Sequence, residues 1–314
     1  IYYGTTTDFV LGGVLDAEKI SGMEELLKFV FLLAFVGFGT KAAVFPMYAW
    51  LPAASVAPTP VTALLHAVAV VNAGAYAVLR VIYYSFGASF LYGTWAQTVA
   101  LLLSCFTILF GSTMAVREQH FKRRLAYSTI SNLSYMLMGA ALMTPDGMTG
   151  SLSHLVIHGV IKITLFYCAG AILIKTGKEY VQDLRGYSRI MPATCGIFLL
   201  GSIALVGTPP LAGFVSKWNL LTAASATELP MGTVAIVCLI ISAILTAIYL
   251  FTAALPMYFR PLNADQAQLA GQKLDPSWMM LVPMGILCAL MIGLGLWSQP
   301  LVTFLRNISA GVIF

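Results

Sequence analysis

The chain has 314 residues, of which 59% are hydrophobic and only 9% are charged, and its mean hydropathy is +0.88. Soluble domains carry about 25% charged residues, so this composition excludes a soluble globular domain, as well as disordered, collagen-like and disulfide-scaffold chains. The net charge of +5 does not indicate a nucleic-acid partner, because no basic run alternates with aromatic residues. The composition predicts a polytopic protein with a lipid membrane as its surroundings.

Residues 1–23 precede the first long apolar stretch. The chain opens on Ile1 and shows no cleavable signal peptide, so we interpret residues 1–23 as an N-terminal segment at the start of a fragment.

Eight stretches along the rest of the chain are long enough to cross a hydrocarbon core of about 30 Å. Two of them are expected to be broken helices. The sixth is too long for one straight helix and contains Pro209 and Pro210, and the first has Gly37 and Pro46 around its middle. The predicted fold is an all-α membrane bundle of about eight transmembrane helices, two of them broken. The stretches lie near 24–51, 59–86, 94–115, 122–143, 148–174, 190–224, 230–258 and 276–297.

The basic residues are distributed unevenly between the loops. If each stretch crosses once, one side has little beyond Lys19, Arg80 and Arg306. By the positive-inside rule the basic loops are cytoplasmic, and both ends of the chain face outward. We expect a multi-pass protein of the inner (plasma) membrane of a prokaryote. The other side holds Arg117, Lys122, Arg123, Arg124, Lys175, Lys178, Arg185, Arg189, Arg260 and Lys273.

The five cysteines lie singly in apolar runs, with no CxxC motif and no Cys/His cluster of metal-binding spacing. We interpret them as small packing residues rather than as a metal or redox pair. No metal or other cofactor is predicted.

Lys41, Lys162 and Lys217 lie far from the ends of their stretches. A lysine at mid-membrane costs about 2.5–3.5 kcal/mol on insertion scales, and such residues usually face a bundle interior and mark ion pathways. The alternative is that each lysine is a structural hydrogen-bond donor to a neighbouring helix.

His154, His158 and Lys162 follow one another in steps of four, which places them on one stripe of a helix. Three titratable groups on one face suit a proton relay, since imidazole exchanges protons through either nitrogen near neutral pH. Two other interpretations remain open: a metal or haem site on the histidine pair, and histidines that are satisfied within the core.

His66 and Asn72 are weaker candidates in the second stretch, because a single polar residue on an apolar face is often structural. No Asp or Glu lies inside any stretch. Buried cations need partners, so we infer that at least one acidic partner lies outside these residues.

Four ordered blocks of the sequence carry a family resemblance. The run GFGTKAAVFPMYAWLPAASVAPTPVTALL at 37–65, followed by His66, resembles the proton-pumping antiporter-like subunits of respiratory complex I. The same family includes Mrp cation/proton antiporters and membrane-bound energy-converting hydrogenases. The resemblance continues in FKRRLAYSTISNLSYM at 121–136, HLVIHGVIKITLFYCAG at 154–170 and GTPPLAGFVSKW at 207–218.

The resemblance implies a fold of fourteen core helices with two inverted five-helix repeats, each containing a broken helix. This chain is similar to the last eight helices. Residues 24–86 would then be the last two helices of the first repeat, 94–258 the whole second repeat, and 276–314 a terminal helix and tail. Interrupted helices in corresponding halves are typical of inverted-repeat transporters.

The resemblance also implies roles for single residues. Lys41 matches the central lysine of the first half-channel, and His66 a histidine of the next helix. Lys217 matches the ionisable residue of the second broken helix, while Asn72 stands where other members have a lysine. The connecting relay matches His154, His158 and Lys162. The family's glutamate partner of the first lysine lies on an upstream helix.

The leading hypothesis is therefore a subunit that translocates protons or Na⁺ in a multisubunit redox-driven pump, or in an Mrp-type antiporter. Its partners would be other membrane subunits, one of which supplies the acidic partner of Lys41 if the chain is split. The redox chemistry would belong to other subunits. The alternative is a stand-alone secondary transporter for a small solute.

Overall fold

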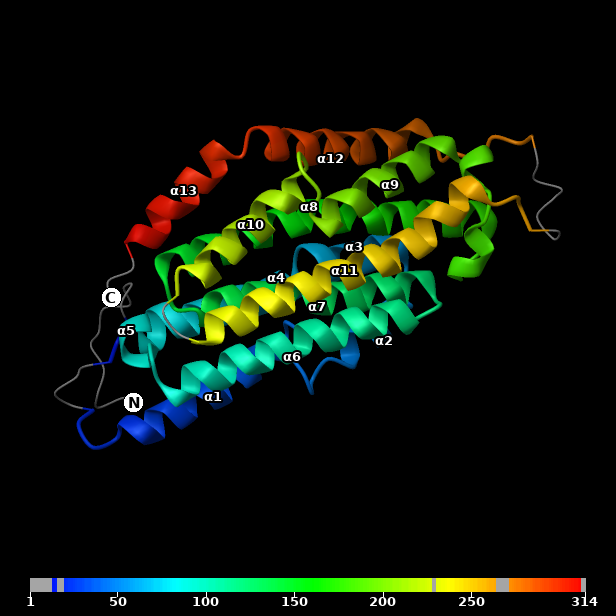
Figure 1. Ribbon diagram of the computed structural model, residues 1–314. Helices are drawn as coiled ribbons and strands as arrows, with labels where there is room; N and C mark the ends of the chain where they lie inside the picture. The colour runs from blue at the N-terminus through cyan, green and yellow to red at the C-terminus, as the bar shows by residue number, and fades with distance from the viewer. Residues whose placement is uncertain (1–12, 16–19, 228–229, 264–270, 312–314) are drawn as a thin grey trace.

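The computed structural model describes residues 13–15, 20–227, 230–263 and 271–311, and this part of the chain is almost entirely helical (Figure 1). The long helices run roughly side by side in one elongated bundle, with α12 and α13 along one edge and α1 towards the opposite edge. The helices are α1 Glu24–Gly39, α2 Trp50–Ala54, α3 Thr59–Ala67, α4 Val70–Arg80, α5 Ala88–Leu91, α6 Trp95–Arg117, α7 Phe121–Ala141, α8 Pro145–Thr176, α9 Pro192–Val206, α10 Ala212–Ser225, α11 Pro230–Phe259, α12 Trp278–Leu296 and α13 Gln299–Ala310.

Local sequence signals set the ends of α8, the longest helix. The Thr144 hydroxyl caps its first turn by accepting a hydrogen bond from the Gly147 N–H at 3.1 Å. Pro145 occupies the first helical position, where its fixed φ and missing N–H cost nothing. The helix ends at Thr176 and is followed by Gly177, whose φ of 67° is left-handed.

Five helices of the described residues are long and apolar enough to cross a membrane, so the prediction of a multi-pass helical membrane protein is confirmed. The first of them counts α3, α4 and the following π-helical turn as one span. They are Thr59–Phe86, Trp95–Arg117, Pro145–Thr176, Pro230–Phe259 and Trp278–Leu296.

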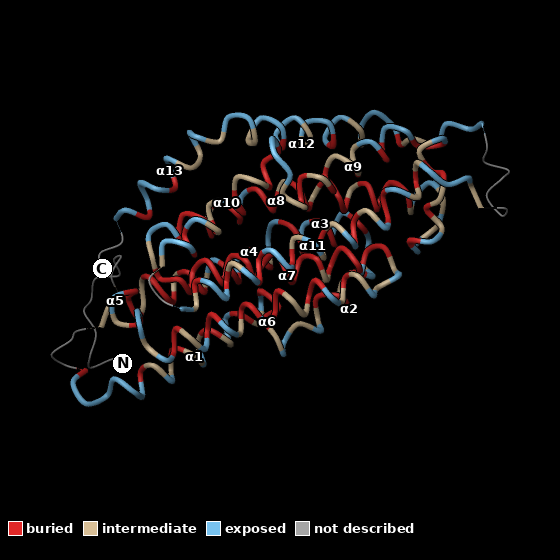
Figure 2. The backbone as a smooth tube through the Cα atoms, viewed as in Figure 1, coloured by how far each residue is buried: buried red, intermediate tan, exposed pale blue. Residues whose placement is uncertain are grey.

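The predicted stretch 122–143 forms α7, which lies outside that set because it is too polar. Its first turn contains three basic residues, and serine, threonine and asparagine follow. Almost every residue of α7 is buried between other helices (Figure 2). A helix surrounded by protein can be polar at membrane depth, because lipid does not contact its side chains.

Both predicted helix breaks are present. After α1 ends at Gly39, the chain makes a series of turns before α2 begins at Trp50. The second break separates α9 from α10, between Val206 and Ala212. A third break, not expected from the sequence, separates α3 from α4 in the stretch 59–86.

The most buried helices, α7 and α8, lie in the middle of the bundle, and the exposed segments lie towards its edges (Figure 2). Helix α8 packs against α3, α7, α9, α10, α12 and α13. This position places the titratable stripe of α8 in the interior of the protein rather than in lipid.

Candidate functional site

The row predicted on α8 is buried along its whole length. His154 is 2% exposed, and His158 and Lys162 are fully buried. The imidazole rings of His154 and His158 are stacked, with centroids 5.8 Å apart and an angle of 24° between their planes. The helical spacing of four residues therefore places the three side chains along one buried stripe of α8.

Lys162 is held by α7. Its Nζ donates to the Leu125 carbonyl at 2.9 Å and to the Ser128 hydroxyl. Both acceptors are neutral, and among the described residues Lys162 forms no ion pair. The ammonium is therefore solvated by dipoles rather than neutralised by a carboxylate.

The break between α9 and α10 builds the environment of Lys217. Its Nζ donates to the Leu205 and Val206 carbonyls, at 2.8 and 3.0 Å, which are at the end of α9. The last carbonyls of a helix have no partner within the helix and carry the negative end of its dipole. The Lys217 ammonium also lies 5.4 Å from the centroid of the Tyr135 ring, within cation–π distance.

Ser216 connects this lysine to the α8 row. Its hydroxyl lies 2.9 Å from Nδ1 of His154, and it directly precedes Lys217 in α10. The site thus extends from Lys162 on α8, through His158 and His154, to α10.

His66 and Asn72 flank the row from α3 and α4. The buried His66 ring stacks on Phe166, one turn beyond Lys162 on α8, with centroids 5.0 Å apart. Asn72 donates to the Ala67 carbonyl at 2.9 Å, across the third helix break. A Cβ at Gly159 of α8 would lie 3.8 Å from the Asn72 amide nitrogen, so this amide faces α8.

Lys41 is separate from this cluster. It lies exposed on the turn after α1 and lines a groove of about 640 Å³ on the outer surface, together with Phe38, Trp50 and Val70. The structure therefore brings six of the seven predicted site residues together and leaves Lys41 on the outside of the bundle.

A cluster of buried hydroxyl groups between α6, α7 and α11 was not predicted from the sequence. The Tyr135 hydroxyl donates to Ser242 at 2.8 Å, and Ser112 lies 2.7 Å from Ser131 and 2.5 Å from Ser242. The signal was present in the run STISNLSY of α7, whose polar residues are unusual at membrane depth. Through Tyr135, this cluster adjoins Lys217.

The described residues contain no group of three His, Cys, Asp or Glu side chains that could hold a metal ion. They also contain buried polar atoms without a hydrogen-bond partner, both in the row and beside it. These include both ring nitrogens of His66 and His158, and Nε2 of His154.

Fold and site together define a multi-pass helical membrane protein in which broken helices and a central helix enclose lysines and histidines. Residues 3–246 match the family described as "NADH:quinone oxidoreductase/Mrp antiporter, TM", and the chain belongs to this family. The family predicted from the four sequence blocks is thereby confirmed.

Curated relatives are similar over most of this chain. NADH-quinone oxidoreductase subunit N of Desulforudis audaxviator is 33% identical over 290 residues, which are 88% of this chain and 56% of that protein. F(420)H(2) dehydrogenase subunit L of Methanosarcina mazei is 35% identical over 235 residues, 72% of this chain and 34% of that protein. The chain therefore spans about half, or less, of the length of these relatives.

Solved structures share the fold. A chain of the Mrp complex from Dietzia superposes with a TM-score of 0.80 at 23% identity, covering 92% of this chain and 60% of that one. A chain of respiratory complex I from Thermus thermophilus gives a TM-score of 0.74 at 24% identity, with the same coverage of both chains.

Proposed function

We propose that the chain is the ion-translocating part of an antiporter-like subunit, in a multisubunit redox-driven pump of the energy-converting hydrogenase or complex I type or in an Mrp-type antiporter. The transported ion is a proton or Na⁺. The observation behind this proposal is the buried row from Lys162 through His158 and His154 to Lys217, in which neither lysine has an ion-pair partner among the described residues.

The chemistry of the row supports proton transfer. An imidazole accepts a proton at one nitrogen and releases one from the other. Buried polar atoms without partners are costly unless water or another group satisfies them, and the free ring nitrogens of His154 and His158 lie along the row. We therefore assign His154, His158, Lys162 and Lys217 to the pathway.

The lysines would be the points at which the pathway responds to its surroundings. A lysine held only by carbonyl and hydroxyl oxygens keeps its full electrostatic sensitivity to a charge brought near it. His66 would connect the row towards the first half of the pathway, and Asn72 would be an auxiliary polar group.

Lys41 would complete its half of the pathway with a carboxylate that lies outside these residues. In the described structure it is exposed in a groove with mostly apolar walls, where an unpartnered ammonium is costly. The relatives are named as subunits, which supports other membrane subunits as partners and a redox chemistry located on them.

For the architecture, we propose eight crossings that correspond to the last eight helices of a fourteen-helix fold. Residues 24–86 would close the first repeat, 94–258 would form the second, and 276–314 would follow them. Eight of fourteen helices is close to the 60% of the Mrp-complex chain that this chain covers. The basic loops would be cytoplasmic in a prokaryotic plasma membrane.

The test is ion pumping by the assembled complex in proteoliposomes. We expect Lys162→Ala and Lys217→Ala to abolish pumping while the complex still assembles. Lys175→Ala is the matched control, since Lys175 lies exposed near the end of the same helix as Lys162, and it should pump normally. A pH-sensitive dye and radioactive Na⁺ uptake distinguish the two ions.

Two results would contradict the proposal. One is a Lys162→Ala complex that pumps with the wild-type number of ions per turnover. The other is solute transport by this protein purified without any partner subunit, which would favour a stand-alone secondary transporter.

A further inference from the structure

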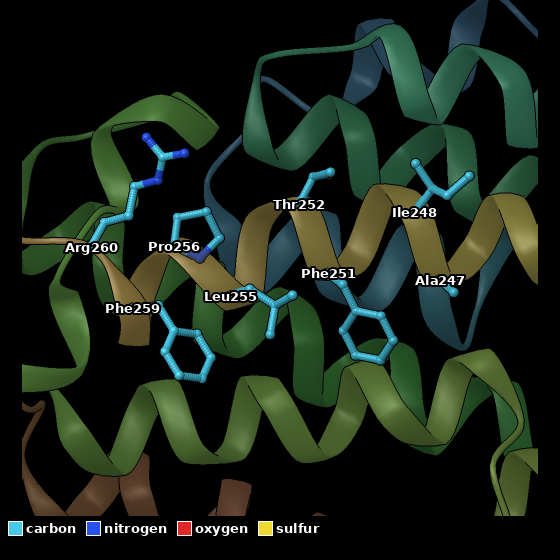
Figure 3. Close-up of a pocket in the computed structure, with 8 residues that line it drawn as sticks. All are labelled: Ala247, Ile248, Phe251, Thr252, Leu255, Pro256, Phe259 and Arg260. Atoms are coloured by element: carbon cyan, nitrogen blue, oxygen red, sulfur yellow. The ribbon is translucent and has the colours of Figure 1, made fainter.

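The outer face of α11 forms an apolar groove near its C-terminal end (Figure 3). We call it the α11 groove; it has a volume of about 630 Å³ and runs from Ala247 to Arg260. Figure 3 shows Phe251, Leu255 and Phe259 pointing to the same side of α11. Phe259 is 81% exposed, so at this end the described part of the protein leaves the apolar surface uncovered.

The groove adjoins a second cavity of opposite character, which we call the arginine pocket. It has a volume of about 280 Å³ and is lined by Arg124, Arg185 and Arg260, with Gln119 and Gln182. None of its described lining residues is Asp or Glu. Since arginine is always protonated in proteins, the pocket concentrates three positive charges.

The pocket and the groove are continuous, because Thr252, Pro256 and Arg260 line both of them. The guanidinium of Arg260 points away from the phenyl rings of Phe251 and Phe259, as Figure 3 shows. One side of the α11 end is thus apolar and the other is cationic.

Two of the three arginines are available for a ligand. Arg124 is committed to the fold, since it donates to the Glu118 and Tyr249 carbonyls and to the Thr252 hydroxyl, at 2.8–2.9 Å. Arg185 is half-buried and Arg260 is exposed. Within the described part of the chain, neither of these two forms an ion pair.

The depth of the site in the membrane suits a lipid. Helix α11 has 30 residues, about 45 Å at 1.5 Å per residue, whereas the hydrocarbon core is only about 30 Å thick. The end of α11 therefore reaches headgroup depth. The α11 groove follows about 20 Å of helix, which is enough to cross the roughly 15 Å of one leaflet.

We propose that this site binds an anionic phospholipid, with an acyl chain along the α11 groove and the phosphate in the arginine pocket. The guanidinium groups of Arg185 and Arg260 donate to the phosphate oxygens, for which their planar fork is well suited. Basic pockets beside membrane helices are typical sites for anionic headgroups. The inference is independent of the ion pathway, which lies in the interior of the bundle.

The experiment measures lipid retention. The complete protein, with the subunits that co-purify, is reconstituted in nanodiscs of phosphatidylcholine and phosphatidylglycerol. The nanodiscs are then exchanged into detergent, and mass spectrometry quantifies the lipid that the protein retains. Each arginine near a headgroup contributes roughly a fivefold change in binding. We therefore expect Arg260→Gln to lower phosphatidylglycerol retention roughly fivefold and the double variant Arg185→Gln/Arg260→Gln roughly 25-fold, with phosphatidylcholine retention unchanged.

Two control variants isolate the site. Arg189→Gln removes an exposed arginine that does not line the pocket, and it should retain phosphatidylglycerol like the wild type. For the acyl chain, Leu255→Asn should reduce retention several-fold, whereas Ile240→Asn should not, because Ile240 is an exposed apolar residue of α11 outside the groove. Arg260 makes no hydrogen bond through its guanidinium among the described residues, so Arg260→Gln should leave the thermal unfolding midpoint unchanged.

Three results would overturn the proposal. The first is equal phosphatidylglycerol retention in Arg260→Gln, the double variant and Arg189→Gln. The second is displacement of the lipid by inorganic phosphate, together with normal retention in Leu255→Asn, which would indicate a site for free anions. The third is a neighbouring protein chain cross-linked to position 255 in native membranes in place of lipid.

Discussion

Lys162 depends on a different helix for its polar contacts. Its acceptors, the Leu125 carbonyl and the Ser128 hydroxyl, both belong to α7. Ser128 in turn donates to the Leu125 carbonyl at 2.9 Å. The hydroxyl therefore accepts a hydrogen bond from the lysine and donates one to the backbone carbonyl. These two bonds fix the geometry around the ammonium. At the scale of single residues, Ser128 is the contact of Lys162 that a substitution can remove.

We predict that Ser128→Ala slows ion translocation. Without the hydroxyl, the ammonium of Lys162 keeps only one of its two protein acceptors, and a hydrogen bond to a charged group is worth about 1.5–3 kcal/mol. If this loss falls on the charged form of the lysine, the pumping rate should decrease roughly tenfold or more. Proteoliposome assays, normalised to the amount of assembled complex, measure the effect.

The control for this variant is Thr129→Ala. Thr129 is also buried in α7, but its hydroxyl donates only to the Leu125 carbonyl of its own helix, at 3.1 Å. The Thr129→Ala complex should pump normally. A Ser128→Ala complex with wild-type pumping would show that this hydroxyl has no part in setting the protonation of Lys162.

At the scale of elements, the break between α9 and α10 creates a polar site within an apolar segment. A continuous helix through residues 206–212 would satisfy the Leu205 and Val206 carbonyls internally. Because α9 stops, both carbonyls are free to accept from Lys217. Gly207 makes this stop possible, since its φ is 93° and a Cβ there would lie 2.9 Å from the Cδ of Lys217.

We predict that Gly207→Ala destabilises the protein and displaces Lys217. A non-glycine residue in a left-handed conformation costs about 1–2 kcal/mol, and the new methyl group also presses on the lysine side chain. The thermal unfolding midpoint should fall and pumping should decrease. Gly285→Ala is the control, because nothing lies within 4 Å of a Cβ at this position of α12, and an unchanged midpoint in both variants would contradict the prediction.

The elements could be predicted from the sequence where a local signal marks them. Pro209 and Pro210 predict the break before α10. The four-residue spacing of His154, His158 and Lys162 predicts the stripe on α8. The break between α3 and α4 has no such signal, since residues 66–72 read HAVAVVN without proline or glycine. There Asn72 donates to the Ala67 carbonyl, a contact between a side chain and the backbone that only the packed structure selects.

The hydroxyl cluster was beyond sequence reasoning for a related reason. Its polar residues on α7 are visible in the sequence, but their partners are remote: Ser242 is 130 residues from Ser112 and 107 from Tyr135. Nothing in a single sequence states which helices become neighbours. The polar run on α7 does predict burial against protein, since lipid cannot satisfy it.

At the scale of the whole molecule, the described bundle has a complete interior and an incomplete edge. The row on α8 is enclosed by helices on several sides, whereas α1, α2 and α4 leave Lys41 on the outer surface. Gly74 allows α4 to approach the Lys41 turn closely, since a Cβ there would lie 2.6 Å from the Cβ of Lys41. The turn that carries Lys41 thus packs closely against α4, while Lys41 itself is exposed.

A lysine facing lipid at membrane depth costs about 2.5–3.5 kcal/mol, so we expect protein to cover the Lys41 groove in the native assembly. A photoreactive amino acid at Ala77, which lines that groove, should cross-link to a polypeptide segment bearing a carboxylate. The same amino acid at Ile286, exposed on α12, reports the lipid background. Cross-links from position 77 to lipid alone would show that Lys41 has no protein partner and would remove it from the proposed pathway.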